Sequence, residues 1–247
     1  MINIATSMFF AEISGSAVAD VAALGSILIP AMKKKGYPGA FAAAVTSSSA
    51  SLAIIIPPSI PMIVYAVMSQ SSVVQLFVAG IIPGVIGGFF LMLAAYVTAR
   101  KKNFPVEETF NIPNVKKTAK DAALAFLLPV IILGGIFGGV VTATEGAGLA
   151  VVASLVIGFI YKEIDFKRLY ESACEGAIQT ASVMLLVAAS VLLGEFLTIE
   201  QIPQKVAESI IEFTNNKYAV LGILNIFLLI IGFFLHSVAA IILTVPI

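Results

Sequence analysis

Residues 47–60 read SSSASLAIIIPPSI, and this stretch decides what fold the chain can adopt. It belongs to an apolar segment of membrane length, which the adjacent Pro57 and Pro58 interrupt. Because proline lacks a backbone N–H and crowds the carbonyl four residues earlier, the carbonyls of Ala53 and Ile54 lose their helical partners. In hydrocarbon an unpaired carbonyl is costly unless protein, water or an ion satisfies it. The stretch therefore predicts a helix broken inside a membrane, either as a kink repaired by neighbouring side chains or, as two prolines favour, as a cation site.

The composition indicates a membrane protein. Of the 247 residues 60% are hydrophobic and only 11% are charged, and the mean hydropathy is +1.06. A soluble domain would carry about a quarter charged residues. The formal net charge is zero and no basic stripe is present, so nucleic acid is not an expected partner. The single cysteine excludes an internal disulfide and a cysteine-rich metal site.

The apolar segments fall into two kinds by length, because a helix needs about 20 apolar residues to span a membrane. The full-length segments are residues 73–99, 122–141, 146–161, 177–197 and 218–235. Two shorter arms, residues 2–13 and 17–32, flank Ser14-Gly15-Ser16 and predict a re-entrant hairpin with this polar tip. Residues 37–56 and 60–68 predict the two halves of one broken helix. The expected fold class is therefore an all-α polytopic membrane protein.

The order of these segments predicts four consecutive parts of the chain. They are a first hairpin and broken helix at 1–70, a scaffold helix and cytoplasmic connection at 71–121, membrane helices leading to an interfacial segment at 122–172, and incomplete second-repeat helices with the start of a second hairpin at 173–247. A surface helix is expected near 115–120 and an interfacial helix near 163–170. Both ends of the sequence fall within apolar runs, so we expect a part of a longer protein.

The basic clusters predict the orientation of the chain in the membrane, and a weak internal repeat predicts its symmetry. Basic clusters lie at 33–35, 100–102, 116–117 and 162–168. All of them can face the cytoplasm if the polar tip belongs to a hairpin entered from that side, and the loop at 198–217 then faces the periplasm. Phe9-Phe10 precede the first tip much as Phe233-Phe234 precede His236-Ser237. Related segments of opposite sense are typical of inverted-repeat transporters, whose sites form where broken elements of both halves meet.

Several polar residues are candidates for binding or gating. Ser14 and Ser16 offer the oxygen ligands that hard cations need, although small residues at such a tip also favour close helix packing. Thr144 and Glu145 suit either a helix cap with an acid in its first turn or a gate, and the cap is favoured. Acids within apolar segments are functional candidates by default. Those that flank the tip are Glu12 and Asp20.

Four motifs carry a resemblance to a known family. Residues 14–25, SGSAVADVAALG, continue to Ile29-Pro30 and Lys35-Gly36-Tyr37. Further along are residues 55–61 (IIPPSIP), 142–145 (TATE) and 232–235 (GFFL). In this order and over essentially the whole chain, the sequence resembles the large membrane subunit of tripartite ATP-independent periplasmic (TRAP) transporters.

The resemblance implies an inverted-repeat, elevator-type fold with re-entrant hairpins and broken helices, similar to other ion transporters. It implies a multi-pass permease of the bacterial inner membrane and not an enzyme. The expected activity is sodium-driven import of a small carboxylate, such as a C4-dicarboxylate, sialic acid or a similar sugar acid. The implied partners are a periplasmic binding protein, which hands over the substrate, a small membrane subunit and the lipid bilayer. Sodium ions are co-transported.

The resemblance also assigns residues to sodium sites. The first site carries over to Ser14 and to the backbone around Ala53, Ile56 and Pro58, and the second to Gly232 and its neighbours. The candidates for substrate contact or gating are Ser16, Pro57, Ser59, Thr144, Glu145 and Ser237. The family often has glycine at the position of Ala53, but the backbone carbonyl of alanine can still act as a ligand. The family often has an acid at the position of His236, and this difference puts a role for the His236 side chain in doubt.

Three other functions compete with this interpretation. A divalent-anion sodium symporter would work without a binding protein. A membrane-embedded enzyme, such as an intramembrane protease, would need paired catalytic groups at one depth, and the sequence offers no evident partner for Asp20 or His236. A non-transporting scaffold or channel subunit would show no saturable uptake.

Overall fold

The computed structural model describes residues 1–105, 122–202, 204–205, 208, 214 and 216–245. Every regular element in these ranges is a helix. Four of the described helices are long and apolar enough to cross a membrane: α5 (Val73–Lys101), α8 (Ala143–Tyr161), α9 (Phe166–Ile199) and α11 (Lys217–Phe234). The expected all-α polytopic membrane fold is confirmed. The predicted surface helix at 115–120 and part of the predicted loop at 198–217 lie outside the described residues.

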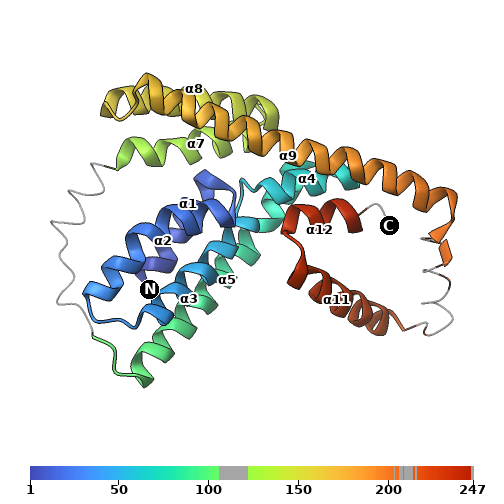
Figure 1. Cartoon of the computed structure of the whole chain (residues 1–247), viewed down its shortest axis with the longest axis horizontal. Coiled ribbons are helices and arrows are strands. Elements are labelled where there is room, and N and C mark those ends of the chain that lie inside the picture. Colours follow the sequence, from blue (N-terminus) through green and yellow to red (C-terminus); the bar gives the residue numbers. More distant parts are fainter. Residues whose placement is uncertain (106–121, 203, 206–207, 209–213, 215, 246–247) are drawn as a thin grey trace. The chain divides into compact units, whose positions relative to one another are not determined.

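Packing divides the chain into two units. The first unit comprises Met1–Met62 and Ser72–Asp165, and the second comprises Ile63–Ser71 and Phe166–Ile247. In Figure 1 the colours follow the sequence, so that most of the first unit runs from blue to yellow and most of the second is orange to red. The predicted hairpin tip and proline break both belong to the first unit.

The first unit begins with a helical hairpin. Its arms are α1 (Ile2–Ser14) and α2 (Ala17–Lys34), which pack against each other. The turn forms because Gly15 adopts a left-handed conformation, with φ 59°, and its N–H donates to the carbonyl of Ala11 at 3.0 Å. Ser16 then begins α2 as its N-cap, accepting from the amide of Ala19 at 3.4 Å. With 13 residues, α1 is about 20 Å long and cannot span a hydrocarbon core of about 30 Å. This length suits a re-entrant arm, which enters the membrane without crossing it.

The broken helix follows the hairpin. It consists of α3 (Gly39–Ala50), a 3₁₀ turn η1 (Ser51–Ile54) and, after the prolines, α4 (Ile60–Ser69). The amides of Ile55 and Ile56 both donate to the carbonyl of Leu52, at 2.9 and 2.8 Å, so the chain tightens before it breaks. The predicted interruption at the proline pair is therefore confirmed. The peptide bond between the two prolines is cis.

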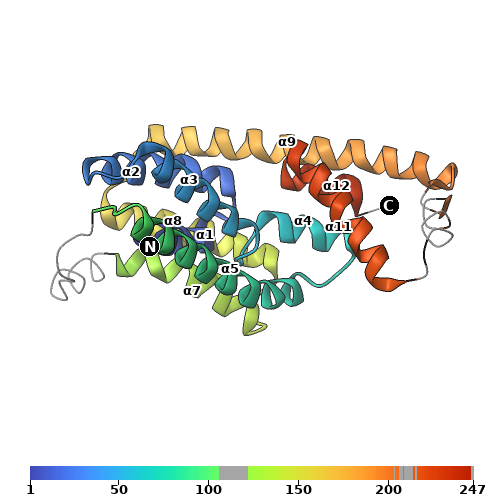
Figure 2. The ribbon, with the colours of Figure 1, turned by 90° about the horizontal axis from the view of Figure 1, so that it is seen from below.

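A stripe of glycines lets α5 approach the broken helix closely. Gly80, Gly84 and Gly88 are buried and recur every fourth residue on one face of α5. A Cβ at Gly84 would lie 2.7 Å from a side-chain carbon of Ile56, and one at Gly88 would collide with Met8. Small residues at this spacing are the usual means by which membrane helices pack backbone to backbone. Figure 2 shows α1, α2, α3 and α5 of this unit gathered together.

Two of the predicted basic clusters meet at one end of the first unit. The hydroxyl of Tyr37 donates to the carbonyl of Pro105 at 2.9 Å, and the rings of Tyr37 and Phe104 are 5.6 Å apart. These contacts join the end of α2 to the end of α5, and thereby bring together the clusters at 33–35 and 100–102. Such a grouping agrees with the predicted cytoplasmic face.

A second helical pair completes the first unit. It consists of α7 (Ala123–Phe137) and α8, which pack against each other. The sequence predicted one segment at 122–141, but α7 ends earlier because Gly138 and Gly139 open a turn, the latter with φ 67°. α8 also begins three residues before the expected 146. The pair is therefore a short helix followed by a full-length one.

The second unit contains α9, α11 and α12 (Ser237–Thr244). The hydroxyl of Ser190 in α9 donates to the carbonyl of Ile242 in α12 at 3.0 Å, and both residues are buried. The sequence predicted a separate interfacial helix near 163–170, whereas residues 166–170 form the first turns of the long α9. α9 is one 34-residue helix because no proline or glycine pair interrupts it.

Candidate functional site

The tip of the first hairpin docks onto the proline break. The carbonyl of Gly15 accepts a hydrogen bond from the amide of Ile60 at 3.2 Å. This amide belongs to the first turn of α4 and has no partner within its own helix. A Cβ added at Gly15 would lie 2.8 Å from the carbonyl oxygen of Pro58, so the two backbones touch. The tip and the break, which are more than 40 positions apart in sequence, thus form one local structure.

The structure repairs one of the two freed carbonyls. The hydroxyl of the fully buried Ser59 donates to the carbonyl of Ile54 at 2.6 Å. This contact is the side-chain repair expected of a proline kink in a membrane helix. Ser59 gives its single hydrogen to Ile54, and its role toward a substrate stays a prediction. Of the two carbonyls predicted to be freed, Ala53 is therefore the one that remains as a candidate ligand.

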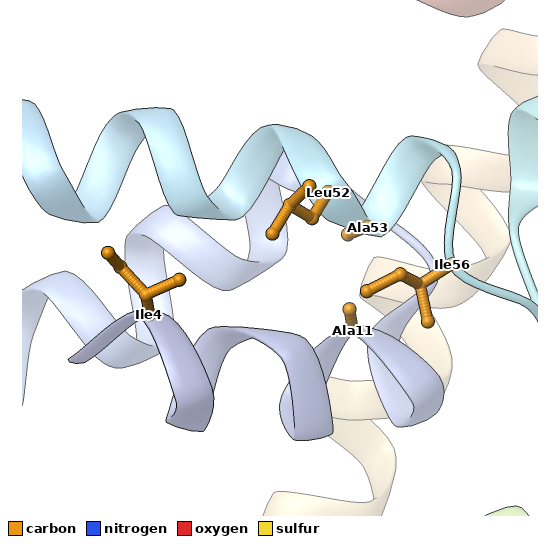
Figure 3. Close-up of a cluster of buried hydrophobic side chains, with 5 residues drawn as sticks. All are labelled: Ile4, Ala11, Leu52, Ala53 and Ile56. Carbon is orange, nitrogen blue, oxygen red and sulfur yellow. The ribbon is translucent and has the colours of Figure 1, made fainter. Parts of the chain in front are cut away.

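Apolar packing holds the candidate backbone oxygens at this place. Figure 3 shows Ile4 and Ala11 of α1 facing Leu52, Ala53 and Ile56. Ala11 and Ala53 are fully buried and Ile56 is 7% exposed. Because small side chains separate the two elements here, the α1 backbone comes close to the residues just before the proline pair. The cluster ends one turn before Ser14, at the base of the tip.

The four residues assigned to the first sodium site are gathered in one neighbourhood of the first unit. Ala53 and Ile56 belong to the apolar cluster, and the carbonyl of Pro58 faces the tip that carries Ser14. The hydroxyl of Ser14 also accepts from the amide of Ser16 at 3.3 Å. An arrangement of hydroxyl and carbonyl oxygens beside a broken helix is the kind that binds alkali cations in transporters.

A buried carboxylate stands directly behind the tip. Asp20 lies in the first turn of α2 and is completely shielded from solvent. One of its oxygens, Oδ1, accepts a hydrogen bond from the hydroxyl of Ser14. Its other oxygen, Oδ2, is buried and has no hydrogen-bond partner among the residues that the structure describes. The sequence suggested Asp20 only as a flanking acid, and its link to Ser14 emerges from the fold.

A buried polar seam that the sequence analysis missed joins α1 to α3. The side-chain amide of Asn3 donates to the hydroxyl of Thr46 at 2.8 Å, and the hydroxyls of Ser7 and Ser49 are 2.8 Å apart. All four side chains are at most 5% exposed. Asn3 and Ser7 are four positions apart on α1, and Thr46 and Ser49 are three positions apart on α3, so the two polar residues of each helix share one face. This spacing is the sequence signal that could have revealed the seam. The seam fixes α1 against α3 beneath the tip.

The gate candidates Thr144 and Glu145 lie at the start of α8. Here the predicted cap was wrong by two residues, because Thr142 and not Thr144 is the N-cap. Glu145 completes a capping box, its amide donating to the Thr142 hydroxyl at 3.2 Å and its carboxylate accepting from the Thr142 amide at 2.8 Å. The exposed Glu145 carboxylate therefore has a structural partner, and Thr144 is exposed.

The remaining candidates fall at different places in the two units. Pro57 is buried at the break, and Ser16 caps α2 at the tip. Gly232 and Ser237 belong to the second unit, on either side of the break between α11 and α12. Gly232 is exposed, and a Cβ there would meet nothing within 4 Å. A second hairpin beginning at this helix–break–helix element stays a prediction.

Comparison with known proteins identifies a family. The family described as the DctM component of tripartite ATP-independent periplasmic transporters matches residues 1–247. The isethionate TRAP transporter permease protein DctMQ of Oleidesulfovibrio alaskensis is 40% identical over 99% of this chain and 39% of its own length. The C4-dicarboxylate TRAP transporter large permease protein DctM of Pseudomonas aeruginosa is 39% identical over 97% of this chain and 56% of its own length.

A third relative has a different substrate in its name. The sialic acid TRAP transporter permease protein SiaT of Haemophilus influenzae is 35% identical over 99% of this chain and 40% of its own length. The chain thus spans between 39% and 56% of the length of these three relatives. The expectation of a transporter component, and not an enzyme, is confirmed.

Proposed function

Because the chain belongs to the DctM component family of tripartite ATP-independent periplasmic transporters, we propose that it forms part of the permease of a sodium-driven importer of small organic anions. The observation that carries the sodium proposal is the docking of Gly15 onto Pro58 and Ile60. This contact collects a hydroxyl and several backbone oxygens beside a broken helix, and unwound backbone carbonyls are the usual sodium ligands of such transporters.

Sodium has a defined task in this proposal. It binds the hydroxyl of Ser14 together with carbonyls around Ala53, Ile56 and Pro58, and so neutralises oxygens that lack helical donors. Binding ties the tip to the break and closes one wall of a substrate cavity. A second sodium binds near Gly232 once the second hairpin is complete. Both ions are cargo and move down their gradient with the substrate.

The substrate is proposed to be a small carboxylate or sulfonate. The names of the relatives include C4-dicarboxylate, sialic acid and isethionate, all of which carry a compact anionic group. The sequence places no Lys or Arg within its apolar segments, so hydroxyls and the N-termini of half-helices are the available anion partners. Sodium at the tip adds further positive charge.

The partners and the movement follow from the same family. We assign to the complete protein a periplasmic binding protein that delivers the anion, a small membrane subunit, and a place in the bacterial inner membrane. The hairpin and broken helix at 1–70 would move as the transport domain against a scaffold, as in an elevator. The small amount of charge in these segments suits passage through a bilayer.

Uptake by the complete transporter tests the proposal. The full-length protein that contains this chain, with its small subunit, is reconstituted in proteoliposomes, and uptake of labelled dicarboxylate, sialic acid and isethionate is measured. We expect uptake only with an inward sodium gradient and added binding protein. Equal uptake in choline would refute sodium coupling, whereas sodium-driven uptake without a binding protein would favour the divalent-anion symporter.

A matched pair of serine variants tests the first sodium site. Ser14→Ala removes the proposed hydroxyl ligand and is expected to raise the sodium concentration needed for half-maximal uptake. Ser47→Ala removes an exposed hydroxyl whose hydrogen bond, among the described residues, goes to the carbonyl of Ala44 in its own helix at 3.2 Å, and is expected to leave sodium dependence unchanged. Unchanged sodium dependence in Ser14→Ala would exclude that residue as a ligand.

A further inference from the structure

An apolar groove lies between α3 and α5, which run side by side in the first unit (Figure 1). The groove is open and has a volume of about 220 Å³. Its walls are formed by Phe41, Ala44 and Val45 of α3 and by Leu91, Ala94 and Ala95 of α5. Each set follows the i, i+3, i+4 spacing that places residues on one face of a helix. The groove therefore offers a ligand a mainly apolar surface.

One end of the groove lies beside a concentration of positive charge. Phe41 and Thr98 line this end, near the start of α3 and the last turn of α5. The basic clusters at 33–35 and 100–102 flank the same two helix ends. All six residues of these clusters are Lys or Arg, and residues 21–106 contain no acid. A ligand that leaves the apolar walls at this end therefore meets basic side chains.

Aromatic rings frame the basic end. The rings of Phe41 and Phe104 are 4.9 Å apart, and the guanidinium carbon of Arg100 lies 5.9 Å from the centre of the Tyr96 ring. Aromatic residues close to Lys or Arg are typical of the boundary between the hydrocarbon core and the lipid headgroups. Basic pockets between membrane helices on the cytoplasmic side are known binding sites for anionic lipid headgroups.

The size of the groove favours a single hydrocarbon chain over a partner helix. Its lining residues extend from 41 to 48 on α3 and from 91 to 98 on α5, which is about 10 Å along each helix at 1.5 Å per residue. A helix is about 10–12 Å wide with its side chains, so the same length of helix has several times the volume of the groove. An acyl chain is narrow and wholly apolar, and it suits both the space and the walls.

We propose that this groove binds an acyl chain of an anionic phospholipid, whose headgroup lies among the basic residues at its end. The walls remove part of the chain from contact with its surroundings, and the Lys and Arg side chains attract the phosphate. The bound lipid bridges α3 and α5 and so stabilises the packing of the first unit. It is a resident ligand and not cargo, so this inference goes beyond the proposed function and does not depend on sodium.

Thermal stability of the complete transporter, stripped of lipid in detergent, tests the headgroup. The protein is titrated with phosphatidylglycerol or with phosphatidylcholine of the same acyl chains, and the rise of the melting midpoint gives an apparent dissociation constant for each lipid. We expect phosphatidylglycerol to bind at least about fivefold more tightly, because its net negative charge is attracted by the basic clusters. Glycerol 3-phosphate, which carries a phosphate without acyl chains, should leave the midpoint unchanged. Equal binding of the two lipids, or equal protection by glycerol 3-phosphate, would overturn the proposal.

Ala94→Leu fills the groove, and Ala79→Leu is its matched control. Both alanines are exposed residues of α5, and Ala79 lies about 22 Å from Ala94 along the helix at 1.5 Å per residue. In Ala94→Leu the larger side chain takes the place of the acyl chain, so the dissociation constant for phosphatidylglycerol should rise at least about tenfold. In Ala79→Leu it should change less than about twofold. An equal rise in both variants would show that the groove is not the binding site.

A pair of charge variants tests the basic end. Arg100→Gln combined with Lys101→Gln removes two positive charges beside the groove and should weaken phosphatidylglycerol binding at least about tenfold, with little effect on phosphatidylcholine. Lys167→Gln combined with Arg168→Gln removes two charges from the start of α9, in the second unit, and should change binding less than about threefold. Equal weakening by the two double variants would reduce the effect to general surface charge and overturn the site.

The remaining outcomes distinguish a lipid from a protein in the groove. If Ala94→Leu releases the small membrane subunit while phosphatidylglycerol binding is unchanged, the groove holds a partner helix and the proposal fails. Ala44→Leu repeats the test from the α3 wall in case Ala94→Leu does not fold. If neither variant folds, the groove has no room for a ligand and the proposal is overturned.

Discussion

Replacing Gly15 by alanine adds one atom, the Cβ, to the hairpin tip where it contacts the proline break. Gly15 has φ 59°, where a residue with a Cβ is disfavoured by about 1–2 kcal/mol. The new Cβ would lie 2.8 Å from the carbonyl oxygen of Pro58, closer than the spacing of about 3.5–4.0 Å at which non-bonded carbons pack. The tip must therefore retreat, and the hydrogen bond to Ile60, worth about 0.5–1.5 kcal/mol, is lost with it. Together these effects predict a destabilisation of roughly 1.5–3.5 kcal/mol.

A second left-handed glycine provides the control for conformational strain. Gly139 in the turn between α7 and α8 has φ 67°, and a Cβ there would meet nothing within 4 Å. Gly139→Ala should therefore show the backbone penalty of about 1–2 kcal/mol and nothing more. The difference between the two variants reports the docking contact itself.

The assay compares thermal midpoints of the complete transporter in detergent, with sodium and with choline. Gly15→Ala is expected to lower the midpoint in sodium more than Gly139→Ala does, and also to reduce the stabilisation gained from sodium. Gly139→Ala should keep the full gain. Equal midpoints and equal sodium gains in the two variants would show that the contact between the tip and the break contributes nothing, and would refute the reasoning.

Two further pairs of variants test the surrounding structure through the same thermal midpoints. Asn3→Ala removes the amide that donates to the buried hydroxyl of Thr46 and should lower the free energy of unfolding by about 1–3 kcal/mol. Asn225→Ala changes an exposed side chain and should alter the free energy of unfolding by no more than about 0.5 kcal/mol. Equal effects of the two variants would contradict a stabilising role of the seam. Thr142→Ala removes the N-cap of α8 and should cost about 1 kcal/mol, while Thr144→Ala should be nearly neutral. The reverse order would restore Thr144 as the cap.

Features with local causes could be predicted from the sequence. The break at Pro57-Pro58 follows from the missing amides of two residues, and the structure interrupts the helix there. The tip at Ser14-Gly15-Ser16 follows from glycine's access to left-handed backbone and from serine's capacity to cap the next helix. Both features need only neighbouring residues, and both were located to within a residue or two.

Other features depend on what lies across the fold. Asn3 and Thr46 are 43 positions apart, and nothing in either helix alone shows that their faces meet. The link between Ser14 and Asp20 spans only six positions, but it crosses a turn whose shape fixes which side chains converge. At the start of α8, Thr142 and Thr144 are both good caps by composition, so the choice depends on backbone angles. Sequence patterns identify candidates here, and packing selects among them.

The strength of the hairpin's attachments differs between α1 and the tip. The buried pairs Asn3–Thr46 and Ser7–Ser49 join α1 to α3, so separating these two helices would leave several polar groups unsatisfied at about 1–3 kcal/mol each. At the tip, the hydrogen bond from Ile60 to Gly15 is worth only about 0.5–1.5 kcal/mol. A ligand that favours the docked tip by about 1.4 kcal/mol changes its population relative to the undocked tip tenfold. The same free energy is too small to separate α1 from α3, so an ion acting on this unit acts on the tip.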